Sequence, residues 1–114
     1  MPFIETKTNV KMSDAQEKQL KEGLGQAISL LPGKSENWLM LAFEDDTHMY
    51  FRGDDSKPVA FVDVKIFGQA DRGAYSAMTA ELSRLYKDVL GVESDHMYIR
   101  YLGSSDWGWN GGNF

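Results

Sequence analysis

The 114-residue chain predicts an α+β fold, a two-layer sandwich in which two helices cover one face of a four-stranded mixed sheet. The main observation is a repeated pattern: each half contains a strand-like, a helix-like and a second strand-like segment, at the length of a β-α-β unit. Right-handed crossovers then place both helices on the same face. The length fits a single domain over residues 1–114.

The first half begins with a strand predicted over residues 2–9, PFIETKTN. A helix follows within residues 11–33, because Ser13 and Gln16 form a capping box and a Pro-Gly pair ends the helical pattern. Residues 37–45, NWLMLAFED, predict the second strand. The apolar stripe of this helix comprises Leu20, Leu24, Ala27, Ile28 and Leu31.

The second half repeats the order. Residues 47–58 predict a short strand and a turn, and residues 59–68 predict a long strand. A helix is predicted over residues 71–90, with Gly91 as its C-terminal stop, and residues 95–103 form the closing strand. The apolar face of this helix comprises Tyr75, Met78, Leu82, Leu85 and Val89.

The strand at residues 38–43 raises a packing problem, because its side chains are apolar on both faces. Two helices cover one face of the sheet, and the chain contains no further helix for the other. We therefore expect another copy of the chain to cover the second face.

Composition excludes several classes of site. The absence of cysteine excludes disulfides, thiolate metal sites and cysteine nucleophiles. A formal charge of -5 without a basic run argues against a nucleic-acid partner. His48 and His96 lack metal-ligand spacing, and Gly23 and Gly25 lie inside a helix, so we expect neither a metal site nor a dinucleotide loop.

No apolar run approaches the ~18 residues of a membrane span, and we expect no membrane partner. Glu5 and Lys7 interrupt what would be the apolar region of a signal peptide. The expected location is therefore the cytoplasm.

Pro2 can supply a reactive group through its backbone nitrogen, without a catalytic side chain. A proline at the start of a strand is also explained simply by its tolerance there. If the initiator methionine is removed, however, Pro2 carries a free secondary amine. An α-amino group has an ordinary pKa of ~7.7–8.0, and burial lowers it further, so a neutral amine can act as a general base.

Five stretches resemble macrophage migration inhibitory factor and its bacterial relatives: MPFIETKTNV at the start, GK at 33–34, AYS at 74–76, MYIRY at 97–101 and GWNGGNF at the end. These proteins belong to the tautomerase superfamily, which has an N-terminal catalytic proline. The resemblance implies a homotrimer of β-α-β-β-α-β subunits with pockets between subunits. It also implies cofactor-free keto–enol tautomerisation of phenylpyruvate-like 2-keto acids.

Carried over to this sequence, the resemblance makes Pro2 the catalytic base and Lys34 the lysine that meets the substrate's carboxylate or carbonyl. Val64 matches an aliphatic position whose backbone amide lies in the pocket, and Tyr98 matches a tyrosine contributed by a neighbouring subunit. Without the resemblance, Lys34 is equally a solvated cation at a helix end, and Tyr98 an ordinary strand tyrosine. Trp38, Trp109 and Phe114 fall at aromatic positions around the pocket and the chain end.

Two positions depart from the family pattern. Arg100 stands where the mammalian cytokine has asparagine, and a second cation near the pocket mouth favours acidic substrates. Lys65 follows Val64 where family members often have glycine. Two other functions stay open: a hydratase or dehalogenase of unsaturated acids within the same superfamily, and a non-catalytic trimeric, cytokine-like binding module.

Overall fold

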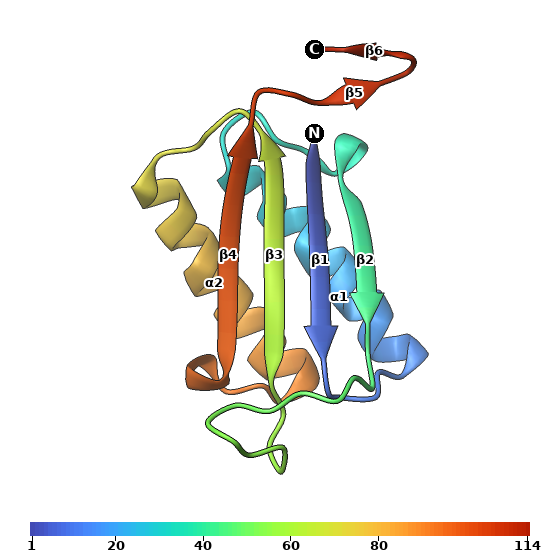
Figure 1. Cartoon of the computed structure of the whole chain (residues 1–114), viewed down its shortest axis with the longest axis vertical. Coiled ribbons are helices and arrows are strands. Elements are labelled where there is room, and N and C mark those ends of the chain that lie inside the picture. The colour runs from blue at the N-terminus through green and yellow to red at the C-terminus, as the bar shows by residue number, and fades with distance from the viewer.

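The computed structural model describes every residue from Met1 to Phe114. Four strands form one sheet, and both long helices lie on the same face of it (Figure 1). This arrangement confirms the predicted α+β class. In chain order the elements are β1 (Pro2–Thr8), α1 (Asp14–Ala27), β2 (Met40–Glu44), β3 (Ala60–Phe67), α2 (Arg72–Leu90), β4 (Met97–Ser104), β5 (Gly108–Trp109) and β6 (Gly112–Asn113).

The sheet has the strand order β2-β1-β3-β4. Strand β1 runs parallel to β2, and β3 runs parallel to β4, so each half of the chain is a β-α-β unit. The two units meet through the antiparallel pair β1 and β3, where Pro2 lies opposite Ile66. The sheet is therefore mixed, as predicted.

The capping box of α1 and the stop of α2 are as predicted, whereas α1 ends at Ala27 and a 3-10 turn over Ile28–Leu30 precedes the predicted Pro-Gly stop. Ser13 and Gln16 form the capping box of α1, and Gly91 closes α2 in the left-handed conformation with φ 72°. The helices lie close together, because a methyl group added at Gly23 would lie 2.5 Å from Leu85 Cδ1. They pack on the inward side chains of the sheet, including Ile4, Val62, Val64 and Ile66.

One polar pair crosses this apolar layer. The Tyr86 hydroxyl of α2 and the Thr6 hydroxyl of β1 are hydrogen-bonded at 2.6 Å, and both residues are fully buried. Burial raises the pKa of the Tyr86 phenol, so the group stays neutral. This hydrogen bond links α2 to the sheet inside the core, where an unpaired hydroxyl would lower the stability of the fold.

Three details of the prediction are wrong. The second strand begins at Met40, because residues 36–38 form a 3-10 turn that contains Trp38. Residues 47–58 contain no strand, only an isolated bridge between Phe51 and Asp54. The C-terminal hairpin β5–β6 was not predicted, since its strands have only two residues each.

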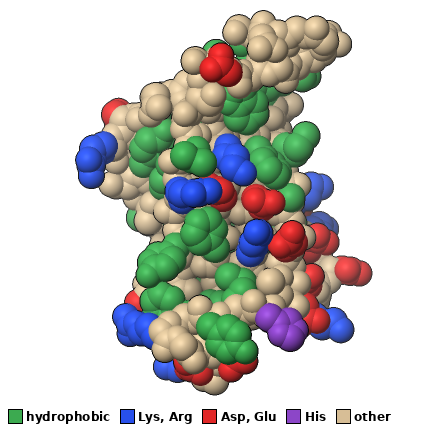
Figure 2. Space-filling view, viewed as in Figure 1, with side chains coloured by type: hydrophobic (Ala, Val, Ile, Leu, Met, Phe, Trp, Pro, Cys, Tyr) green, Lys and Arg blue, Asp and Glu red, His purple; other side chains and the backbone are tan.

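The sheet face away from the helices is open in the single chain. Exposed apolar side chains lie there, with Met40 66%, Tyr98 63% and Leu102 44% exposed. Figure 2 shows hydrophobic side chains above and below a central band of acidic and basic ones. The face is therefore less uniformly apolar than the pattern of β2 alone indicates. None of the helices combines the length and the apolar character that crossing a membrane requires.

Candidate active site

Pro2 lies at the end of the sheet, as the first residue of β1, and is buried. The residue before it is held as well, because the Phe67 backbone amide donates to the Met1 carbonyl at 3.0 Å. While Met1 is attached, the Pro2 nitrogen is part of an amide and cannot accept a proton. A reactive amine at Pro2 therefore requires removal of Met1.

Lys34 reaches the same end of the sheet from the turn after α1. That turn passes through Gly33 at φ 79°, and the Lys34 backbone amide donates to the Leu31 carbonyl at 3.1 Å. Lys34 Nζ then donates to the Phe67 carbonyl oxygen at 2.7 Å and lies 5.9 Å from the centre of the Phe67 ring. The ammonium group is thus fixed next to the start of the chain.

The electrostatics of this end favour a neutral amine. Burial, and then the charge of Lys34, lower the pKa of the Met1 amino terminus. Pro2 follows Met1 at the same end of the sheet and is buried.

Aromatic rings gather at this end of the sheet. Trp38 and Trp109 meet edge to face with centroids 5.1 Å apart, and Phe67 and Phe114 do so at 5.3 Å. The C-terminal hairpin supplies two of the rings. It lies across the end of the sheet near the N-terminus (Figure 1), and it turns through Asn110 and Gly111, both at positive φ. We call this group the aromatic cluster: Trp38, Phe67, Trp109 and Phe114.

Val64 lies further into the sheet than Pro2 within one chain, and its place in the pocket stays a prediction. Its side chain is fully buried among the helices, and its place in the sheet is opposite Ile4 and Tyr101. At the end of β3, the backbone of Phe67 contacts both Met1 and Lys34.

Tyr98 does not lie near Pro2 within one chain. Ile66, the sheet partner of Pro2, pairs with Gly103 on β4. Tyr98 lies five residues before Gly103, or about 17 Å along the strand. Arg100 is also displaced from Pro2, because it pairs with Asp63 in the middle of the sheet.

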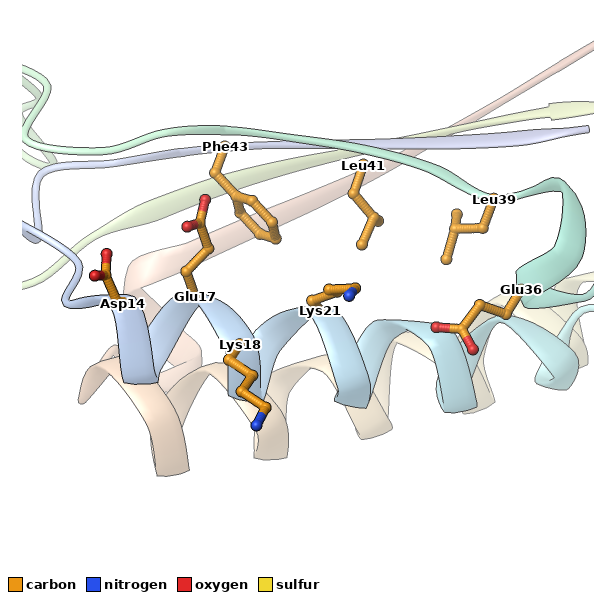
Figure 3. Close-up of a pocket in the computed structure, with 8 residues that line it drawn as sticks. All are labelled: Asp14, Glu17, Lys18, Lys21, Glu36, Leu39, Leu41 and Phe43. Atoms are coloured by element: carbon orange, nitrogen blue, oxygen red, sulfur yellow. The ribbon is translucent and has the colours of Figure 1, made fainter.

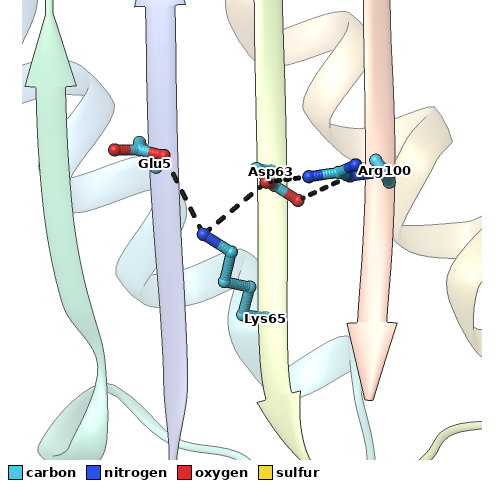
Figure 4. Close-up of polar contacts among 4 residues, drawn as sticks. All are labelled: Glu5, Asp63, Lys65 and Arg100. Carbon is cyan, nitrogen blue, oxygen red and sulfur yellow. Dashed lines mark hydrogen bonds and ion pairs between the residues drawn. The ribbon is translucent and has the colours of Figure 1, made fainter. Parts of the chain in front are cut away.

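Arg100 belongs to a charge network on the open face, drawn in Figure 4. Its Nη2 and Nε donate to the two Asp63 carboxylate oxygens at 2.7 and 3.2 Å. Lys65 Nζ lies 3.6 Å from Asp63 Oδ2 and 3.9 Å from Glu5 Oε1. The hydrogen bonds from Arg100 lower the pKa of the Asp63 carboxyl, although burial opposes this, and Asp63 is only 5% exposed.

The largest hollow of the single chain lies elsewhere, between α1 and β2, with a volume of about 840 Å³. Figure 3 shows Leu39, just before β2, and Leu41 and Phe43 of β2 pointing toward α1. These three side chains pack on the hydrophobic core, and none of the predicted site residues lines the hollow. We therefore assign the candidate site to the end of the sheet at Pro2.

Comparisons with known proteins identify the family of the chain. The family model described as Macrophage migration inhibitory factor (MIF) matches residues 1–114. No curated protein sequence matches the chain. Among solved structures, the chain is similar to MIF2 of Leishmania major, with 30% identity and a TM-score of 0.91, covering 100% of this chain and 97% of that one.

Two further structures share the fold. A MIF homologue of Prochlorococcus marinus is 25% identical with a TM-score of 0.81, and the match covers 98% of each chain. The protein Pt0534, solved as inactivated by 2-oxo-3-pentynoate, is 18% identical with a TM-score of 0.85, over 96% of this chain and 93% of that chain. With a family model matched from end to end, the chain belongs to the macrophage migration inhibitory factor family of the tautomerase superfamily.

Proposed function

We propose that this protein, once Met1 is removed, is an isomerase that catalyses keto–enol tautomerisation of phenylpyruvate-like 2-keto acids. The observation that supports this most directly is the position of Pro2. It is buried at the end of the sheet next to the anchored Lys34 ammonium, where burial and positive charge favour a neutral terminal amine. The aromatic cluster offers apolar ring faces and edges against which an aryl substituent can pack.

In the proposed reaction the neutral Pro2 nitrogen removes a proton from the carbon next to the ketone. The electron pair moves into a carbon–carbon double bond, and negative charge develops on the ketone oxygen. Lys34 holds the substrate carboxylate by a charge-assisted hydrogen bond. Protonation of the oxygen completes the enol, and the proton on Pro2 returns to solvent.

The proposed site uses residues of two chains. Tyr98 lies about 17 Å from the proline end along β4 of its own chain, and its hydroxyl forms no hydrogen bond within that chain. We place Tyr98 and Arg100 at the Pro2 site of a neighbouring copy, in a homotrimer that covers the exposed Met40 and Leu102 side chains. Tyr98 then donates to the developing oxyanion, and Arg100 adds a cation at the mouth.

The test is a phenylpyruvate tautomerase assay on protein whose N-terminus has been identified by mass measurement. Protein that begins at Pro2 is expected to be active, and Pro2→Gly is expected to lose most of the rate. An alanine inserted before Pro2 converts the amine into an amide and is expected to abolish activity. Equal rates for all three proteins would remove Pro2 from the mechanism.

A covalent probe provides a second measurement. The compound 2-oxo-3-pentynoate, which inactivates Pt0534, is itself a 2-keto acid with an alkyne conjugated to its ketone. Such an alkyne reacts with neutral amines, so a single adduct on Pro2 is expected near neutral pH. Modification of lysines alone would contradict a selectively neutral proline amine.

A further inference from the structure

We propose that Phe51 is a positioning residue that fixes the Tyr98 side chain for catalysis. This rests on the function proposed above, in which the Tyr98 hydroxyl stabilises the developing oxyanion. The Phe51 and Tyr98 rings meet edge to face, with centroids 5.7 Å apart and planes at 72°. This is a favoured geometry for two aromatic rings.

Within its own chain, Tyr98 has little other support. The residue is 63% exposed on the open face of β4, and its hydroxyl has no partner within the chain. An exposed side chain exchanges among its staggered rotamers, and each exchange moves the hydroxyl by several ångströms. A ring packed against one side of Tyr98 favours a single rotamer.

Phe51 is itself held rigidly, at the tip of the loop between β2 and β3. Two backbone hydrogen bonds close the turn, from the Phe51 amide to the Asp54 carbonyl at 2.9 Å and back at 3.0 Å. Arg52 and Gly53 both have positive φ, 56° and 77°, as a tight type I′ turn requires. The turn therefore presents the Phe51 side chain in one direction.

Two further groups confine the Phe51 ring. The Arg52 guanidinium carbon lies 5.0 Å from the ring centre, and the His96 ring lies 5.1 Å from it. His96 and Tyr98 are two positions apart, so Phe51 contacts both through one ring. These contacts fix the loop tip against the start of β4.

The base of the loop is fixed as well. The Asn9 side chain donates to the Lys57 carbonyl at 2.9 Å and accepts from the Val59 amide at 2.8 Å. On the other side, the Thr47 amide donates to the Thr8 carbonyl at 3.0 Å. Both ends of the loop are thus attached to the end of β1, and Phe51 is a stable support for Tyr98.

The experiment compares Phe51→Leu, which removes the ring, with Phe51→Tyr, which keeps it. The matched control is Tyr50→Leu, since Tyr50 is the adjacent aromatic residue and is 66% exposed. The χ1 couplings of ring-labelled Tyr98 are measured by NMR, with its signals assigned from Tyr98→Phe. The rates of phenylpyruvate tautomerisation are measured on the same samples.

In Phe51→Leu the Tyr98 couplings are expected to average over several rotamers, and kcat to fall roughly 2- to 10-fold, as loss of one aromatic pair predicts. KM is expected to stay within about 2-fold, because the oxyanion exists only in the transition state. Phe51→Tyr and Tyr50→Leu are expected to match the unmodified protein.

A single Tyr98 rotamer in Phe51→Leu would overturn the proposal, and so would averaged couplings with an unchanged kcat. Failure of the proposed function is a separate result: the unmodified protein beginning at Pro2 would then be inactive. The coupling measurement does not depend on activity, so it decides in either case whether Phe51 fixes Tyr98.

Discussion

At the scale of single residues, Lys34 has two roles in the proposed reaction. Its ammonium group disfavours protonation of the nearby terminal amine, and it binds the substrate carboxylate. Lys34→Met is expected to lower kcat/KM at neutral pH roughly 10- to 100-fold, the worth of one hydrogen bond to a charged group. The pKa of the Pro2 amine is expected to rise, because a nearby positive charge is lost.

The measurement is the pH dependence of kcat/KM. Its ascending limb reports the deprotonation of the base in the free enzyme, so it is expected to move to higher pH in Lys34→Met. The control is Lys18→Met, an exposed lysine on α1 away from the site. If the ascending limb lies at the same pH in Lys34→Met as in the unmodified protein, Lys34 does not lower the pKa of the base.

Asp63 gives a prediction about stability. Its carboxyl pKa is lowered in the folded chain by the hydrogen bonds from Arg100, so the ionised form stabilises the fold. This contribution is fully present above the ordinary pKa of an aspartate. It is lost as the pH falls through the lower, folded-state pKa, below about pH 4.

Asp63→Asn is therefore expected to lower the free energy of unfolding by about 1 kcal/mol at pH 7, since Arg100 is largely solvated. The difference from the unmodified protein is expected to shrink at pH 3. Urea unfolding at the two pH values checks both points, with Glu5→Gln as the control for the longer 3.9 Å contact to Lys65. An equal difference at both pH values would contradict the assignment.

The sequence was sufficient for part of the site. Pro2 and Lys34 follow from motifs, and the structure brings them to one end of the sheet. Val64 lies two positions before Ile66, the sheet partner of Pro2, so its role in the pocket stays a prediction. Phe51 could not be predicted, since its contacts with His96 and Tyr98 are set by a turn far away along the chain.

At the scale of elements, the ends of β3 and β4 support the site through a close backbone contact. The Gly68 amide donates to the Ser104 carbonyl at 2.8 Å, and a methyl group at Gly103 would overlap the Gly68 carbonyl oxygen. Backbone atoms cannot move aside as a flexible side chain can. Gly103 is therefore required by packing.

Gly103→Ala is expected to lower the free energy of unfolding by about 1–3 kcal/mol, the usual cost of overpacking. Because Phe67 precedes Gly68 and contacts both Met1 and Lys34, tautomerase activity is expected to fall as well. The control is Gly112→Ala, where an added methyl group meets open space. Chemical unfolding and the rate assay on both variants check the prediction, and equal stability of the two would refute it.

The elements themselves were predictable where local signals are strong. The capping box at Ser13, the stop at Gly91 and the long apolar periodicity fix both helices within a few residues. The loop between β2 and β3 was harder, because its turn residues also suit a short hairpin strand, and only one bridge forms there. The two-residue strands of the C-terminal hairpin carry no periodicity at all.

At the scale of the whole molecule, the proposed active site is incomplete in the single chain. The proposed base, Pro2, and the proposed oxyanion donor, Tyr98, lie on different strands of one sheet, about 17 Å apart along the strand direction. Two explanations are possible: Tyr98 acts at the Pro2 site of a neighbouring copy, or Tyr98 has no catalytic role. If Tyr98 has no catalytic role, Tyr98→Phe keeps its full rate; if Tyr98 acts on a neighbour, a mixture of two inactive variants recovers activity.

Pro2→Gly and Tyr98→Phe are each expected to lose most activity, for different reasons. If a trimer pairs Pro2 of one copy with Tyr98 of the next, random mixing of the two variants creates sites with both residues intact. When an equal mixture is unfolded and refolded together, about one quarter of the sites are intact. Each site needs its Pro2 from one variant and its Tyr98 from the other, and each of these is met in about half of the cases. About one quarter of the unmodified rate is therefore expected.

The control is the same mixture combined without unfolding, in which each trimer keeps one kind of chain and stays inactive. Measured molar mass by light scattering confirms that the refolded sample has the size of three chains. If both residues served the same chain, no mixed site would contain both, and the refolded mixture would stay as inactive as its components. The recovered rate thus measures directly whether the active site is shared between neighbours across the open face of the sheet.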